Sequence, residues 1–137
     1  MMNDLPETFA RAAKGDIDAQ AAMLDHMVGY AISQPLLTVE YLNTIEMWAR
    51  MLMTHGRPCD AHRLAGVLLF RSSVYRRVGI SEVGELMADE GMRILNCLAD
   101  EGDELAADKR ATVGDLIARG RDVPASIMMD QRQGTAH

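Results

Sequence analysis

Apolar residues recur every three or four positions along most of this sequence, and glycine or proline interrupts each run. This pattern constrains the chain to a series of helices. The clearest run follows Thr38, where Leu42, Ile45, Ala49 and Leu52 are three or four residues apart and therefore share one helix face, expected to pack in a core. The predicted helices span about residues 6–14, 16–32, 38–55, 58–78, 81–101 and 103–119, and a short one follows Pro124.

The composition also favours helices over sheets. Alanine, leucine and methionine outnumber the β-branched residues, and aromatic residues make up only 4% of the chain. A chain of 137 residues, 48% of them hydrophobic, can bury the core of one domain without a metal or a disulfide. We therefore expect an all-α fold, either a short solenoid of αα-hairpin repeats or an irregular bundle of about six helices.

Capping residues mark several of the predicted helix starts. Asp16, Thr38 and Ser81 each precede an apolar run, and acids follow Ser81 where the helix dipole favours them. Within one chain we expect a helical domain over residues 1–122, followed by a short helix and a polar tail over residues 123–137.

Three glycines, Gly15, Gly56 and Gly102, stand at similar boundaries between a helix and an alanine-containing successor. They lie 41 and 46 residues apart, which is within the range of stacked two-helix repeats. Glycine is suited to such turns because it adopts left-handed backbone conformations readily. The spacing predicts three helix pairs.

The segment 41–69 carries a more specific pattern: Trp48-Ala49-Arg50, then Gly56, then Ala61 followed by Leu64-Ala65-Gly66. With these residues the chain resembles the Sel1-like and tetratricopeptide class of αα-repeats, over roughly residues 6–119. The resemblance implies a module that binds other proteins, in which the first helices of the pairs line a concave face.

The overall charge narrows the choice of partner. The net charge is −6, so the molecule as a whole repels phosphate backbones and anionic lipids.

The first residues lack the basic and apolar regions of a secretory signal, and no stretch is apolar enough to cross a membrane. We expect a cytoplasmic protein in which Cys59 and Cys97 are thiols.

The charges are unevenly distributed along the chain. Residues 50–77 hold six arginines and one acid, whereas residues 82–104 hold eight acids and one arginine. The two segments can neutralise each other across neighbouring helices, or the basic helix can bind an acidic partner, including a second copy of the chain. A nucleic-acid contact through Arg71, Arg76 and Arg77 is the third possibility.

Sequence motifs of common enzymes are missing, so no catalytic residue and no cofactor are assigned. The chain has no Walker A loop, Gly-x-Ser-x-Gly, His-Glu-x-x-His or Rossmann glycine pattern. His55, Cys59 and His62 are metal-ligand types, and Cys59 and His62 could share a helix face. A glycine and a proline, however, place His55 and Cys59 on different elements, and zinc requires a further donor. We expect a turn with a core-facing thiol there, and no metal site.

Some apolar residues could serve either the core or a binding surface. Met47 and Met51 are expected in the core, with an exposed docking groove as the alternative, and the same choice applies to Trp48. Gly84 and Gly91 are seven residues apart and so lie on one helix face, where close helix packing is expected.

These observations predict a non-catalytic module that binds a protein or peptide, self-association included. Its expected contact residues are Tyr41, Trp48, Arg71, Arg76 and Arg77. The alternative is a small helical DNA-binding regulator that uses the arginine-rich helix over residues 60–78, with residues 67–83 as a loose helix-turn-helix.

Overall fold

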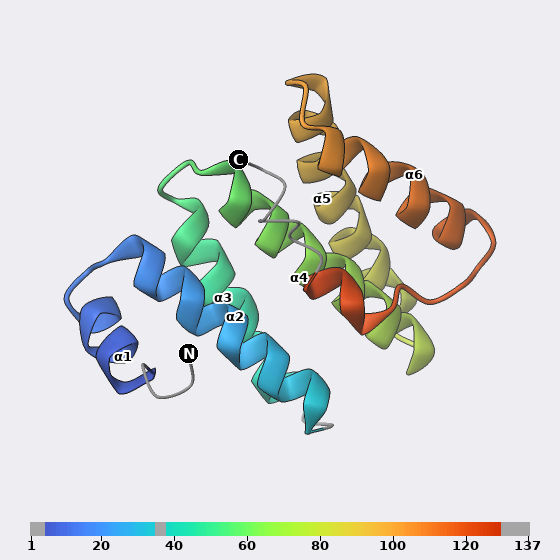
Figure 1. Cartoon of the computed structure of the whole chain (residues 1–137). Helices are drawn as coiled ribbons and strands as arrows, with labels where there is room; N and C mark the ends of the chain where they lie inside the picture. Colours follow the sequence, from blue (N-terminus) through green and yellow to red (C-terminus); the bar gives the residue numbers. More distant parts are fainter. Residues whose placement is uncertain (1–4, 35–37, 130–137) are drawn as a thin grey trace.

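The computed structural model describes residues 5–34 and 38–129 (Figure 1). These residues form helices and connecting turns, with no strand among them, which confirms the predicted all-α class. The elements are α1 (Leu5–Ala13), α2 (Ile17–Ser33), α3 (Val39–Met53), α4 (Pro58–Arg77), α5 (Ser81–Asp100), α6 (Glu104–Ala118) and the short 3-10 helix η2 (Ala125–Met128).

The helices pack in chain order. Each helix from α1 to α6 lies against the next, and η2 returns to pack on α4. Figure 1 shows α4 in the middle, with α2 and α3 on one side and α5 and α6 on the other. This arrangement fits both a short helical repeat and a helical bundle. No helix of the described residues is long and apolar enough to cross a membrane.

The central helix α4 is buried on all sides. Every residue from 60 to 73 is buried, because α3 and α5 flank the helix and η2 covers another part of it. Burial on all sides also encloses charged groups, which is costly unless they are paired. The carboxylate of Asp60 accepts hydrogen bonds from Arg57 (2.7 Å) and Arg63 (3.1 Å), and Arg63 also forms two bonds to Asp25 on α2, at 2.8 and 2.9 Å.

Glycines set the close contact between α4 and α5. A Cβ added at Gly84 would lie 2.8 Å from the Ser72 carbonyl oxygen, and one added at Gly91 would lie 2.8 Å from Cγ of Leu69. Both distances are shorter than a normal contact, so side chains at these positions would push the helices apart. The prediction that the two glycines serve close helix packing is confirmed.

Two of the predicted helix caps are confirmed and one is wrong. The side chains of Asp16 and Thr38 accept hydrogen bonds from backbone N–H groups at the starts of α2 and α3, at 3.0 and 3.2 Å. Ser81 does not cap α5; it is the first residue of the helix, and Ile80 occupies the cap position without a capping side chain. The reason is that the first hydrogen bond of α5 runs from the Gly84 N–H to the Ile80 carbonyl, directly after the turn that closes α4, so the helix begins one residue earlier than predicted.

The segment after α6 belongs to the same core as the helices. Val123, Ile127 and Met128 are buried in the core cluster, although the sequence pattern places the end of the helical domain at residue 122. The backbone of η2 reaches α4 closely because Gly66 has no side chain: a Cβ there would lie 2.8 Å from the Ile127 carbonyl oxygen. The polar tail over residues 130–137 lies outside the described residues.

The turns at Gly56 and Gly102 have the predicted left-handed backbone, with φ of 75° and 97°. A Cβ added at either glycine would meet no atom within 4 Å, so a substitution there strains the backbone and nothing else. Replacing either glycine by Val is expected to lower the free energy of unfolding by about 1–2 kcal/mol. Urea unfolding of each variant measures this loss. Gly29→Val is the control: Gly29 lies within α2, outside the left-handed region, and its replacement should change stability by less than about 0.5 kcal/mol.

Candidate functional site

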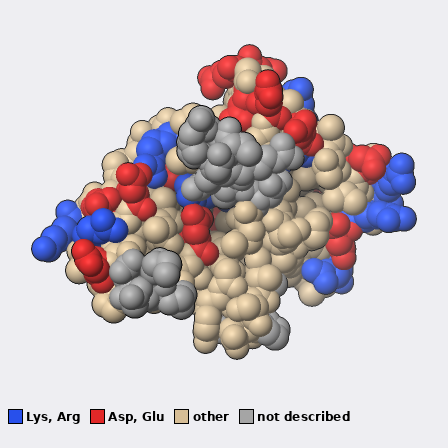
Figure 2. All heavy atoms as spheres, viewed as in Figure 1, with Lys and Arg blue, Asp and Glu red and all other residues tan. Residues whose placement is uncertain are grey.

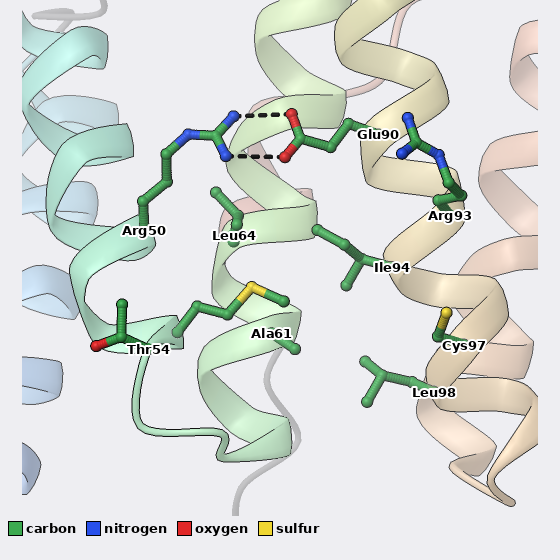
Figure 3. Close-up of a pocket in the computed structure, with 10 residues that line it drawn as sticks. Arg50, Thr54, Ala61, Leu64, Glu90, Arg93, Ile94, Cys97 and Leu98 are labelled. Atoms are coloured by element: carbon green, nitrogen blue, oxygen red, sulfur yellow. Dashed lines mark hydrogen bonds and ion pairs between the residues drawn. The ribbon is translucent and has the colours of Figure 1, made fainter.

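A pocket of about 450 Å³ lies between α3 and α5, with α4 as its floor (Figure 3). We call it the α3–α5 groove. It exists because α3 and α5 both pack on α4, so the surface of α4 between them forms a shallow floor. The uncharged residues that line it are Met53 and Thr54 on the α3 side, Ala61 and Leu64 on α4, and Ile94, Cys97 and Leu98 on α5.

One ion pair spans the groove from wall to wall. The guanidinium of Arg50 on α3 donates two parallel hydrogen bonds to the carboxylate of Glu90 on α5, both at 2.8 Å (Figure 3). These hydrogen bonds hold the pKa of Glu90 below its usual range, and Glu90 in turn raises the pKa of Arg50. Both side chains remain partly open to solvent. The pair therefore crosses a mostly apolar groove where the groove is open to solvent.

A second carboxylate, that of Glu46, also binds Arg50. Glu46, one helical turn before Arg50, accepts a hydrogen bond from its Nε at 2.9 Å and another from Nη1 of Arg71 at 2.6 Å. Arg71 also donates to Asn43 and Tyr75, at 2.6 and 3.1 Å, and only 4% of it is exposed. A partner-binding role for Arg71 needs an accessible guanidinium, and the structure instead places it inside, where it holds α3 to α4.

The other two predicted arginines lie apart from the buried Arg71, near the segment that follows α6. Arg76 donates to the backbone carbonyl of Arg121, and Arg77 lies at the surface near Asp122. The three arginines therefore do not form one basic patch. On the face shown in Figure 2, basic side chains are scattered among acidic ones, while acidic side chains gather where α5 joins α6. Of the three residues predicted to contact DNA, Arg71 is not accessible at the surface.

The aromatic residues singled out in the sequence lie on the other side of α3. Trp48 lines a second pocket of about 210 Å³ that α1, α2 and α3 form together, and Phe9 and Met51 are part of its lining. Tyr41 is partly buried against the core, where its hydroxyl lies 3.5 Å from the Met27 carbonyl oxygen. Neither aromatic residue is in the α3–α5 groove.

The two methionines beside Trp48 are exposed. Met47 and Met51 have 64% and 65% of their surface accessible, so the prediction that they lie in the core is wrong. The predicted stripe of Leu42, Ile45, Ala49 and Leu52 is fully buried, and it uses the face of α3 that packs inward. The methionines fall outside this stripe and remain on the surface.

Of the predicted histidine and cysteine cluster, His62 joins α4 to α6. His62 is buried in α4, and its Nε2 lies 2.9 Å from Oδ2 of Asp103, the residue that caps α6; Nζ of Lys109 lies 3.5 Å from Nδ1 of the same ring. Partial burial works to raise the pKa of Asp103, but the hydrogen bonds from the Ala106 N–H and from His62 outweigh it, and the pKa lies below its usual range. In the described part of the chain, no three His, Cys, Asp or Glu side chains are grouped to hold a metal ion. Cys59 and Cys97 are both free thiols, as predicted.

Sequence reasoning missed Arg50 and Glu90 as a pair, although it anticipated that the two charged segments could neutralise each other. Among the described residues, this is the one arginine pair that joins residues 50–77 to residues 82–104. The remaining paired arginines of the basic segment turn to carboxylates on other elements, such as Asp25 and Glu46. The available signal was the position of Arg50 on the exposed side of a strongly amphipathic helix.

Comparisons with known proteins give no further guide. No family model, curated protein or solved structure matches this chain. The resemblance to Sel1-like and tetratricopeptide repeats therefore stays a prediction.

Proposed function

We propose that this chain is a non-catalytic module that binds a segment of another protein in the α3–α5 groove. The observation that carries the proposal is a mostly apolar pocket of about 450 Å³ that lies open between two helices packed on the same central helix. Concave, mostly apolar sites with a few polar groups are the usual form of a binding site. The polar groups here are largely engaged with each other, because Arg50 already holds Glu90 and Glu46. This favours binding over catalysis.

The surface around the groove supports a protein partner. Val83 and Leu86 are exposed on α5, seven and four residues before Glu90 and so on the same side of the helix. On α3, Met47 is exposed three residues before Arg50, whereas Met51 lines the other pocket. Exposed apolar side chains beside an apolar groove are typical of a surface that another chain covers. Methionine is well suited to this because its flexible side chain adapts to different partners.

The positions of the two pockets agree with the repeat interpretation. The first helices of the three predicted pairs are α1, α3 and α5. The smaller pocket is lined mainly by α1 and α3, with Gln20 of α2 at its edge, and the larger one lies between α3 and α5. In αα-repeat proteins this is the face expected to bind peptides. We propose a cytoplasmic setting, in line with the two free thiols.

The test is a selection of peptides of twelve residues from a random phage-displayed library. Cys97 is an exposed residue that lines the groove, so Cys97→Trp fills the space without disturbing the core. We expect selected peptides to bind the unmodified protein at least tenfold more tightly than this variant, because the indole occupies the volume that the peptide needs. Fluorescence anisotropy with labelled peptides measures both affinities.

Ala111→Trp is the matched control, because it adds the same side chain at an exposed position of α6 outside the groove. It should bind the peptides as well as the unmodified protein. Binding that survives Cys97→Trp, or a selection that returns no peptide sensitive to it, would refute the proposal. Sedimentation of the free protein tests for a second copy: a dimer that Cys97→Trp dissociates would assign the groove to self-association instead.

A further inference from the structure

We propose that the segment bound in the α3–α5 groove carries a carboxylate next to its apolar side chains, and that this carboxylate takes the place of Glu90 on Arg50. The inference rests on the proposed function and specifies the chemistry of the partner. Four features of the groove support it: its charge, the exposure of its ion pair, the neighbours of the guanidinium and the apolar surface beyond the pocket.

The charges at the groove favour an anion. Two arginines, Arg50 and Arg93, line it against one carboxylate, Glu90. Among the described residues Arg93 forms no ion pair or hydrogen bond. The protein as a whole carries a net charge of −6, so this local positive excess stands out from its surroundings. A partner with a negative charge would therefore be attracted to the groove and repelled by most of the remaining surface.

The ion pair across the groove is built so that its carboxylate can be exchanged. Both side chains are partly open to water, and ion pairs in such settings contribute little net stability. The hydrogen bond from its Nε to Glu46 keeps Arg50 oriented while Nη1 and Nη2 face Glu90. These two nitrogens offer a parallel pair of donors, the arrangement that binds any carboxylate in bidentate form.

Glu90 has another cation nearby when it leaves Arg50. Arg93 follows it by three residues on α5, and its charge contributes to the lowered pKa of Glu90. Residues three apart on a helix are neighbours, so the released carboxylate stays next to a positive charge. After the exchange, Arg50 pairs with the carboxylate of the partner and Glu90 lies next to Arg93. Two contacts between opposite charges therefore replace one ion pair.

The surroundings of the guanidinium require apolar side chains beside the acid. Leu64 lies on the floor near the ion pair, and Ile94 lies on the α5 wall one turn after Glu90 (Figure 3). The apolar surface continues beyond the pocket through Leu86 on α5 and Met47 on α3, both exposed. A small carboxylic acid would leave this outer surface uncovered, whereas a peptide covers it.

Two substitutions with opposite expected effects test the exchange. Arg50→Gln should weaken binding of the selected peptides about tenfold or more, because it removes the two charged hydrogen-bond donors. Glu90→Gln should strengthen binding about threefold, because it removes the carboxylate that competes for Arg50. Anisotropy titrations of both variants with the peptides from the selection give these ratios. Arg119→Gln is the control, since Arg119 forms a surface ion pair with Asp115 outside the groove, and it should leave the affinity unchanged.

The peptide provides the second half of the test. Replacing its Asp or Glu by the amide should weaken binding to the unmodified protein and should have little further effect on Arg50→Gln, as expected for two groups in direct contact. If the peptides need the open groove but bind equally well as amides, the proposed function stands and this inference is wrong. Weaker or unchanged binding to Glu90→Gln would also overturn it, and a selection without peptides sensitive to Cys97→Trp would overturn both proposals.

Discussion

Replacing Asp60 by Ala is expected to lower the free energy of unfolding by about 3 kcal/mol. The side chain of Asp60 is 0% exposed, and its carboxylate accepts hydrogen bonds from both Arg57 and Arg63. Arg63 is itself buried, and without Asp60 its charge would depend on Asp25 alone. Breaking a buried ion pair by removing one partner is costly because the other charge has already lost its water. Urea unfolding of the variant measures the loss.

Asp18→Ala is a closely matched control. Asp18 pairs with the same Arg57, but its side chain is 90% exposed, so its removal should cost less than about 1 kcal/mol. The two aspartates thus share a partner and differ in burial. Equal losses for both variants would show that the buried carboxylate contributes no more than the exposed one, and that the enclosed charges of α4 are not what holds α2 to α4.

The helices themselves could be predicted because their signals are local. The stripe of α3, the caps at Asp16 and Thr38, and the left-handed glycines at positions 56 and 102 each depend on residues within a few positions of one another. Propensity, spacing and capping chemistry act over one or two turns. The prediction that Ser81 caps α5 is the exception. Ile80, the last residue of the preceding turn, occupies the cap position, and that turn depends on how α4 ends.

The arginines of α4 could not be placed from the sequence because their partners are distant along the chain. Arg63 pairs with Asp25, and Arg71 pairs with Glu46, 38 and 25 residues away. A count of charges along residues 50–77 therefore suggests a basic surface that the fold does not form. One signal was available: the apolar residues of α4 surround the helix rather than forming a stripe, and such a helix is buried with its charges paired.

The candidate groove was beyond the sequence for a similar reason. Arg50 and Glu90 are 40 residues apart, and although the pattern of α3 puts Arg50 on its exposed side, nothing local points to Glu90 as its partner. The groove requires α3 and α5 to pack on the same helix, which is decided by the tertiary arrangement. The methionines were mispredicted although the sequence held the answer, because Met47 and Met51 lie outside the stripe that the spacing itself identifies. Few aromatic residues made methionine look like core filler, but alanine and leucine fill the inward face of α3.

Replacing both Gly84 and Gly91 by Ala is expected to lower the free energy of unfolding by about 2 kcal/mol. Each added Cβ would lie 2.8 Å from an atom of α4, at the Ser72 carbonyl oxygen for Gly84 and at Cγ of Leu69 for Gly91. Overpacking of this kind costs about 1–3 kcal/mol at each site. The higher helix propensity of alanine returns up to about 1 kcal/mol per position, so the loss exceeds the gain. Urea unfolding of the double variant measures the balance.

Gly114→Ala should act in the opposite direction, which makes it the decisive comparison. Gly114 also lies inside a helix, α6, but a Cβ there would be 3.9 Å from Cε of Met92, an ordinary contact. Here the propensity gain is unopposed, and stability should rise by up to about 1 kcal/mol. Because the same substitution is made in each helix, the difference in sign isolates the close approach of α4 and α5. A double variant as stable as the unmodified protein would mean that the two helices can separate at no cost, and that the α3–α5 groove is not held at a fixed width.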